Sequence, residues 1–188
     1  MYKFIKSYLM ITGLLFILTQ FLFLSCNKND IPQSTLVLRD SLIYKNGETR
    51  PFTGHEKARI EDKIIEYDVV NGIKQGDFKL YFLNGNLQIE GWLKDNKNVG
   101  EWKYYYNSGE LESQGEFKND KPKGEWTWYY PSGTLKERGN YFEGKRIGKW
   151  QQFDEGGRII NEKEFSLQDS INNVENHFKS LNRKKTNN

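Results

Sequence analysis

The chain has 188 residues, with 28 Lys and Arg, 25 Asp and Glu, and a formal net charge of +3. This near balance gives no electrostatic reason to expect a nucleic-acid partner, and the single cysteine excludes an intramolecular disulfide. Aromatic residues make up 15% of the chain beside 28% charged residues, which favours many half-buried strands over a helical bundle.

Residues 1–25 have the organisation of an export signal. Lys3 and Lys6 precede an uncharged, mostly apolar run over residues 8–24. The sequence Phe-Leu-Ser-Cys at 23–26 resembles a bacterial lipobox, which implies cleavage before Cys26 and covalent lipid on its sulfur. The mature chain would then have 163 residues and a formal charge of +1, because two lysines are lost. An uncleaved anchor is the alternative, since a run of this length is near the lower limit of about 17 residues for crossing a bilayer.

Between residues 72 and 165 the chain repeats every 24 residues without a gap. Two phases of the repeat are always glycine: Gly76, Gly100, Gly124 and Gly148, and Gly85, Gly109, Gly133 and Gly157. A third phase has Gly91, Gly115 and Gly139 but ends in Lys163. Two further phases are aromatic: Phe78, Trp102, Trp126 and Trp150, and Tyr81, Tyr105, Tyr129 and Phe153. A worn copy covers residues 52–72, and residues 44–47 resemble the end of another. A fixed period of this size indicates a repeat architecture.

Each unit reads as a β-hairpin. Residues 101–106 alternate with a period of two, the turn residues 107–110 contain Gly109 at a position that tolerates positive φ, and residues 111–118 alternate again. Pairing Tyr106 with Leu111 sets Tyr104 opposite Ser113 and Trp102 opposite Gly115. In this register Gly115 leaves room for the indole of its hairpin partner. The sequence therefore predicts an all-β fold, an elongated single-layer antiparallel sheet of tandem 24-residue hairpins.

The predicted organisation has five parts. A signal peptide covers residues 1–25, a linker 26–40, the repeat domain 41–165, a C-terminal helix 166–181 and a basic tail 182–188. Apolar residues at helical spacing give the C-terminal segment one apolar face. They are Leu167, Ile171, Val174, Phe178 and Leu181. We expect this helix to cap the last repeat, and binding of a partner helix or the membrane surface is the alternative.

Residues 100–117 resemble the bacterial MORN-repeat variant. The shared pattern is a glycine, an aromatic residue, a Tyr-Tyr pair, Asn-x-Gly, and a glycine before an aromatic residue. Residues 124–141 match as well, and residues 76–93 and 148–165 match more loosely. Proteins with such repeats are often labelled YwqK-family antitoxins, and MORN repeats in eukaryotes are described as binding proteins or lipids. The resemblance implies an interaction module and specifies no activity.

The sequence offers no catalytic or metal-binding constellation. His55 and His177 are the only histidines and do not have the spacing of metal ligands. Lipid on Cys26 would remove the only thiol, the serines lack a nucleophile elbow, and the glycine intervals do not fit a phosphate-binding loop. We therefore predict a protein that is not an enzyme and has no metal and no cofactor apart from the covalent lipid.

The aromatic side chains supply the candidate binding surface, because exposed aromatic patches on a single-layer sheet are typical of binding. Its predicted residues are Trp102, Tyr104, Tyr105, Trp126, Trp128, Tyr129, Tyr130 and Trp150. We predict a lipoprotein of the bacterial cell envelope, anchored to a membrane and facing the periplasm, that binds a protein or a glycan polymer. The alternative is an antitoxin-like immunity protein that masks a toxin.

Overall fold

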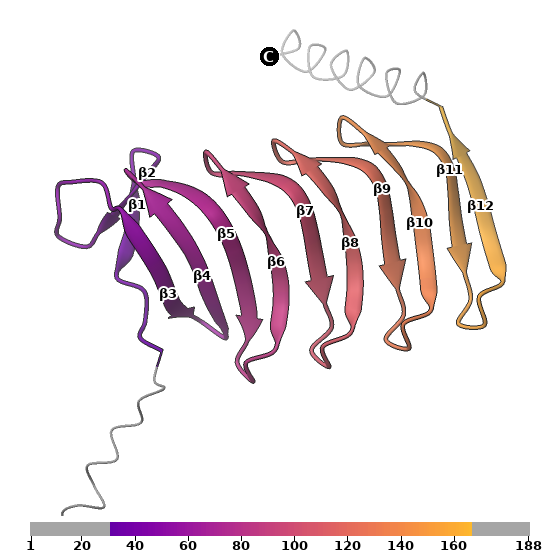
Figure 1. Ribbon diagram of the computed structural model, residues 1–188, viewed down its shortest axis with the longest axis horizontal. Helices are drawn as coiled ribbons and strands as arrows, with labels where there is room; N and C mark the ends of the chain where they lie inside the picture. The colour runs from indigo at the N-terminus through magenta and orange to yellow at the C-terminus, as the bar shows by residue number, and fades with distance from the viewer. Residues whose placement is uncertain (1–30, 167–188) are drawn as a thin grey trace, which may run out of the picture. The chain divides into compact units, whose positions relative to one another are not determined.

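The computed structural model describes residues 31–166, and its regular elements are all β-strands. They are β1 (Leu36–Arg39), β2 (Leu42–Lys45), β3 (Gly54–Ile60), β4 (Lys63–Val70), β5 (Ile73–Phe82), β6 (Leu87–Lys94), β7 (Lys97–Tyr105), β8 (Leu111–Lys118), β9 (Lys121–Tyr129), β10 (Leu135–Phe142), β11 (Lys145–Phe153) and β12 (Ile159–Phe165). Strands β3 to β12 form one antiparallel sheet in which every strand pairs with its sequence neighbours (Figure 1). The predicted all-β fold of tandem hairpins is confirmed. The predicted signal peptide, with Cys26, and the apolar positions of the predicted C-terminal helix, with His177, lie outside the described residues.

Two kinds of turn alternate along the sheet. Two-residue turns with positive φ at both positions connect β6 to β7 and β8 to β9, at Asp95–Asn96 and Asn119–Asp120. This geometry matches the right-handed twist of paired strands. Longer turns connect β7 to β8 and the equivalent strands, and there Gly109 has a φ of 102°. The predicted positive φ at Gly109 is confirmed.

The predicted register within a hairpin is right in its centre and wrong at its turn end. Strands β7 and β8 pair Trp102 with Gly115 and Tyr104 with Ser113, as expected. Leu111 then pairs with Tyr105 instead of Tyr106, because a β-bulge leaves one extra residue on β8. The same shift occurs between the paired strands of the other long-turn hairpins, so it belongs to the repeat.

The third glycine phase makes room for the indole of the following hairpin, which corrects the expectation above. A Cβ on Gly115 would lie 2.2 Å from Cδ2 of Trp126, in β9, instead of meeting its own partner Trp102. A Cβ on Gly91 would lie 2.2 Å from the ring of Trp102, and a Cβ on Gly139 would lie 2.2 Å from that of Trp150. Each glycine therefore fixes how one hairpin packs on the next. Lys163 is tolerated in this phase because its strand, β12, is the last in the sheet.

The N-terminal strands β1 and β2 form a separate two-stranded sheet. Strand β1 lies within residues 26–40, the predicted linker. Ile43 of β2 packs with Tyr67 and Val69 of β4 into a buried cluster, which Leu36, Phe52, Ile65 and Phe78 extend. The side chains of this hairpin therefore pack against β4 and β5. Figure 1 shows the hairpin at the β3 end of the sheet.

Candidate functional site

The ten-stranded sheet has two chemically different faces. We call the side that carries Phe78, Trp102, Trp126 and Trp150 the tryptophan face, and the side that carries Tyr81, Tyr105 and Tyr129 the tyrosine face. Alternation along each strand places these two sets on opposite sides.

On the tryptophan face the main aromatic row is core and not surface. Trp102, Trp126 and Trp150 are 4%, 6% and 3% exposed. Phe117 contacts the rings of both Trp102 and Trp126 edge-on, at centroid distances of 5.9 and 5.1 Å. The structure therefore corrects the predicted binding surface at these three tryptophans, whose side chains are inaccessible to a partner.

The two ends of this aromatic row differ from its centre in the residues that pack there. At the first end Tyr67 occupies the phase that is glycine later, and the residue that follows it in the row is the smaller Phe78 in place of a tryptophan. At the last end no further indole follows Trp150, and the guanidinium of Arg146 lies 3.9 Å from its ring centroid. The row therefore ends in Tyr67 and Phe78 on one side and in a cation–π contact between Arg146 and Trp150 on the other.

Three further predicted surface residues are half-buried and held by the repeat. Tyr104 and Trp128 lie on the tryptophan face, where each contacts the ring of Trp126, at 6.3 and 5.8 Å. The hydroxyl of Tyr130 donates to the backbone oxygen of Phe153 at 2.9 Å, one hairpin further on. These side chains contribute to packing between hairpins and expose only part of their area.

The tyrosine face carries an unbroken row of polar side chains across all ten strands. The row follows the register from strand to strand as Lys57, Glu66, Lys79, Glu90, Lys103, Gln114, Thr127, Arg138, Gln151 and Glu162. Charges alternate over the first five strands, where Lys57 Nζ lies 2.8 Å from Glu66 Oε2. Beyond Lys103 the row becomes mostly neutral or basic. Sequence reasoning missed this row because it joins residues 9 to 13 positions apart through the register.

Two tyrosines of this face are hydrogen-bonded to glutamates of the polar row. Tyr81 donates to Glu66 at 3.2 Å, and Tyr105 donates to Glu90 at 2.6 Å. Burial, together with the carboxylate, raises the pKa of Tyr81 to about 12 and raises that of Tyr105 further.

At the same spacing along the chain, Tyr129 corresponds to Gln114 and Phe153 to Arg138, whose guanidinium lies 5.6 Å from the ring of Phe153. The residue at this spacing therefore changes from glutamate to glutamine to arginine along the sheet.

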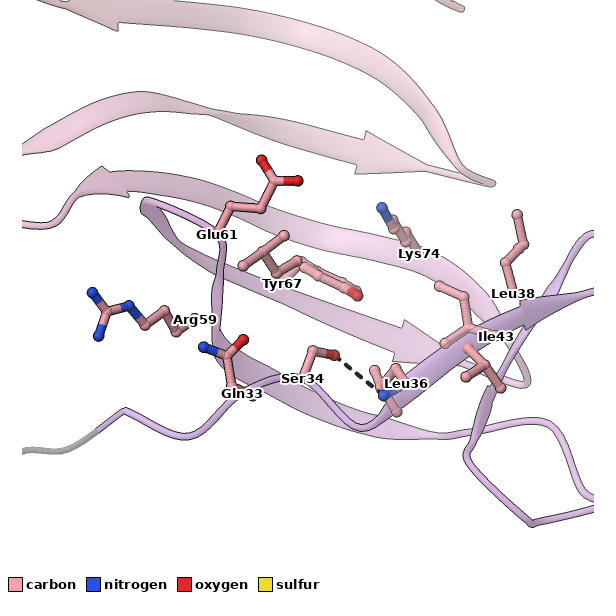
Figure 2. A pocket seen from close by; sticks show the side chains of 11 residues that line it. Gln33, Ser34, Leu36, Leu38, Ile43, Arg59, Glu61, Tyr67 and Lys74 are labelled. Carbon is pink, nitrogen blue, oxygen red and sulfur yellow. Dashed lines mark hydrogen bonds between the residues drawn. The ribbon is translucent and has the colours of Figure 1, made fainter.

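A hollow of about 500 Å³ lies between the β1–β2 hairpin and the tryptophan face (Figure 2). Leu36, Leu38 and Ile43 lie at one end and Arg59 at the other (Figure 2). Lys74 lies 4.6 Å from the ring centroid of Tyr67. Burial lowers the pKa of Lys74 and raises that of Tyr67.

A second hollow, of about 620 Å³, opens on the tyrosine face over β3 to β6. Its lining includes the imidazole of His55, whose Nδ1 lies 2.8 Å from Asp68 Oδ1. Nε2 of the same ring lies 3.6 Å from Glu66 Oε1. His55 is thus placed among carboxylates by the sheet, which the sequence had not indicated.

Residues 31–166 contain no group of three His, Cys, Asp or Glu side chains that could hold a metal ion. Within the same range no helix is long and apolar enough to span a bilayer.

The comparisons with known proteins agree with the repeat. The family model of the MORN repeat variant matches residues 74–91, 98–119 and 122–143, about a third of the chain. These segments correspond to the hairpins β5–β6, β7–β8 and β9–β10. The chain therefore contains MORN-type repeats, which supports the class of a repeat binding module.

Among solved structures the chain is similar to a chain of the "Glycosylation Associate Protein (Gap123) complex from Streptococcus agalactiae". The identity is 13% and the TM-score 0.35, over 75% of this chain and 26% of that chain. No curated protein matches the sequence significantly.

Proposed function

We propose that this protein is a non-catalytic binding module of the bacterial cell envelope, anchored by lipid on Cys26, and that its tyrosine face docks a protein or an envelope polymer. The carrying observation is the unbroken polar row across ten strands, flanked by Tyr81, Tyr105 and Tyr129. Tyrosine beside fixed hydrogen-bonding groups is typical of recognition surfaces.

The distribution of burial favours this face over the opposite one. On the tryptophan face the largest side chains pack between hairpins, because Trp102, Trp126 and Trp150 are only 4%, 6% and 3% exposed. The tyrosine face instead presents charged and amide groups on a sheet in which β4 to β11 are each held on both sides by neighbouring strands. A partner would therefore meet a preorganised surface and lose little free energy in ordering it.

Photo-crosslinking in cells tests the docking face. A photoreactive phenylalanine analogue replaces Tyr129 in the full-length chain, and the matched control replaces Tyr104 on the tryptophan face. We expect an adduct from position 129 that excess unlabelled protein suppresses, and none from position 104. Absence of a suppressible adduct at position 129 would overturn the proposal. One stoichiometric protein in the adduct would identify a toxin-like partner, whereas a smear of polymer would identify the envelope.

Mass spectrometry of the amino terminus, with metabolic fatty-acid labelling, tests the anchor. We expect a mature chain that starts at Cys26 and carries acyl mass, because several acyl chains are needed for stable attachment. Cys26→Ser should abolish labelling and leave residues 1–25 uncleaved. An unlabelled chain that retains Met1 in the unsubstituted protein would refute the lipoprotein assignment.

A further inference from the structure

Trp92 departs from the pattern of the repeat. It lies on β6 with its side chain on the tyrosine face, and it is 49% exposed, whereas three of the other tryptophans are buried. Later repeats carry Glu116, Asn140 and Glu164 in its phase, so packing between hairpins does not require an indole there. Among residues 31–166 no other aromatic ring stacks on Trp92, in contrast to the tryptophan row. The exposed part of its indole is a flat apolar surface beside a polar N–H group, which suits contact with a ligand.

Trp92 lines the hollow of about 620 Å³ on this face, together with His55, Asp68, Gln75 and Lys94. Nδ1 of His55 is hydrogen-bonded to Oδ1 of Asp68 at 2.8 Å, and the amide nitrogen of Gln75 donates to Asp95 at 2.6 Å. Within the described range, Asp68 Oδ2, Gln75 Oε1 and Lys94 Nζ have no hydrogen-bond partner. The hollow thus offers one aromatic platform with two free acceptors and one free donor around it.

We propose that this hollow binds a saccharide, with one sugar ring stacked on the indole of Trp92 and its hydroxyls bonded to Asp68, Gln75 and Lys94. A sugar ring matches this lining because its faces are apolar and its rim both donates and accepts hydrogen bonds. The volume is within the range of roughly 300–1,000 Å³ that is usual for ligand sites. The inference rests on the proposed function and specifies the chemistry of one site on the tyrosine face.

Other ligand classes fit the lining less well. Phosphate groups select clustered cations, but here Lys94 shares the lining with the carboxylate of Asp68. An extended peptide would need unpaired backbone groups; of the strands that line the hollow, β4, β5 and β6 are each paired on both sides, and only the edge strand β3 has a free side. An acyl chain would place the free carboxylate oxygen of Asp68 against hydrocarbon, which costs free energy.

The test uses the full-length protein in detergent on an array of bacterial surface and storage oligosaccharides, followed by calorimetric titration of the strongest binder. Trp92→Glu introduces the residue that the chain itself has at 116, so the fold is retained, and circular dichroism verifies it. The matched control is Phe142→Lys, which removes an exposed aromatic side chain elsewhere and introduces the residue found at 118. We expect Trp92→Glu to weaken binding at least tenfold and Phe142→Lys to change it less than twofold.

Two results would overturn the saccharide site. One is an array on which no oligosaccharide binds, and the other is equal binding by Trp92→Glu and Phe142→Lys. If position 129 still gave a suppressible crosslink in either case, the proposed function would stand and only this site would fail. A protein adduct that Trp92→Glu abolishes, together with a blank array, would assign the hollow to a protein partner instead.

Discussion

Gly115 of β8 lies directly beneath the indole of Trp126 of β9, so close that a single added carbon would be 2.2 Å from the ring. The indole nitrogen of Trp126 also donates to the backbone oxygen of Glu116, at 3.2 Å. This pair joins two successive hairpins through one steric fit and one hydrogen bond. The same fit and bond recur at Gly139 and Trp150, where Trp150 donates to Asn140 at 3.2 Å, whereas Gly91 and Trp102 share only the steric fit.

Gly115→Ala should therefore destabilise the sheet. The methyl group cannot be accommodated without displacing the ring of Trp126, and overpacking of this kind costs about 1–3 kcal/mol. Urea denaturation followed by tryptophan fluorescence measures the change in the free energy of unfolding. Lys163→Ala is the matched control, because it changes the same phase in the last strand and should stay within about 0.5 kcal/mol. Equal stability of the two variants would contradict the packing described.

Trp102→Phe should lower the free energy of unfolding less than Trp126→Phe does. Nε1 of Trp102 is buried and, within residues 31–166, has no hydrogen-bond partner, whereas Nε1 of Trp126 donates to Glu116. Phenylalanine removes an unsatisfied donor in the first case and a formed bond in the second, a difference of about 1 kcal/mol. Denaturation midpoints of the two variants provide the measurement. A larger loss for Trp102→Phe would show that this indole nitrogen has a partner in solution.

Alkaline pH should weaken the tyrosine face. A tyrosine whose pKa is raised in the folded state contributes stability that is complete below its ordinary pKa of about 10. For Tyr81 this contribution is lost as the pH rises from about 10 through about 12. Absorbance of tyrosinate at alkaline pH should show a late-ionising group. Glu66→Gln should shift it to lower pH, because the hydrogen-bonded carboxylate is one of the causes of the raised pKa. An unchanged titration in that variant would contradict the assignment.

Charge alternation on the polar row should be measurable through Lys79. Its cross-strand neighbours are Glu66 and Glu90, so Lys79→Glu places three carboxylates side by side. Like charges directly opposite each other cost roughly 0.2–1 kcal/mol per pair. The loss should shrink in 1 M NaCl, where the Debye length is about 3 Å. Lys79→Gln is the control for loss of the lysine itself, and equal, salt-independent losses in both variants would exclude an electrostatic origin.

Some features of the fold were readable because they are local. The period of 24 residues, the glycine of the long turns and the alternation along each strand predict the hairpins and their central register, and all three are confirmed. The bulge opposite Tyr105 was missed because its extra residue leaves no mark in a pattern of alternation. The site was predicted less well than the fold. The sequence identifies which positions are aromatic but not which rings are covered.

The sequence by itself determined the repeat, because a steric requirement that recurs in every unit leaves the same residue at the same spacing. Only the tertiary structure decided which tryptophans are buried, because the indole of one hairpin covers the glycine of the hairpin before it. It also decided that lysine, glutamate, glutamine, threonine and arginine from ten strands form one row, since the strand register places two phases of the 24-residue repeat opposite each other. The structure also distinguished Trp92, because the exposure of its side chain depends on which residues the neighbouring strands place around it.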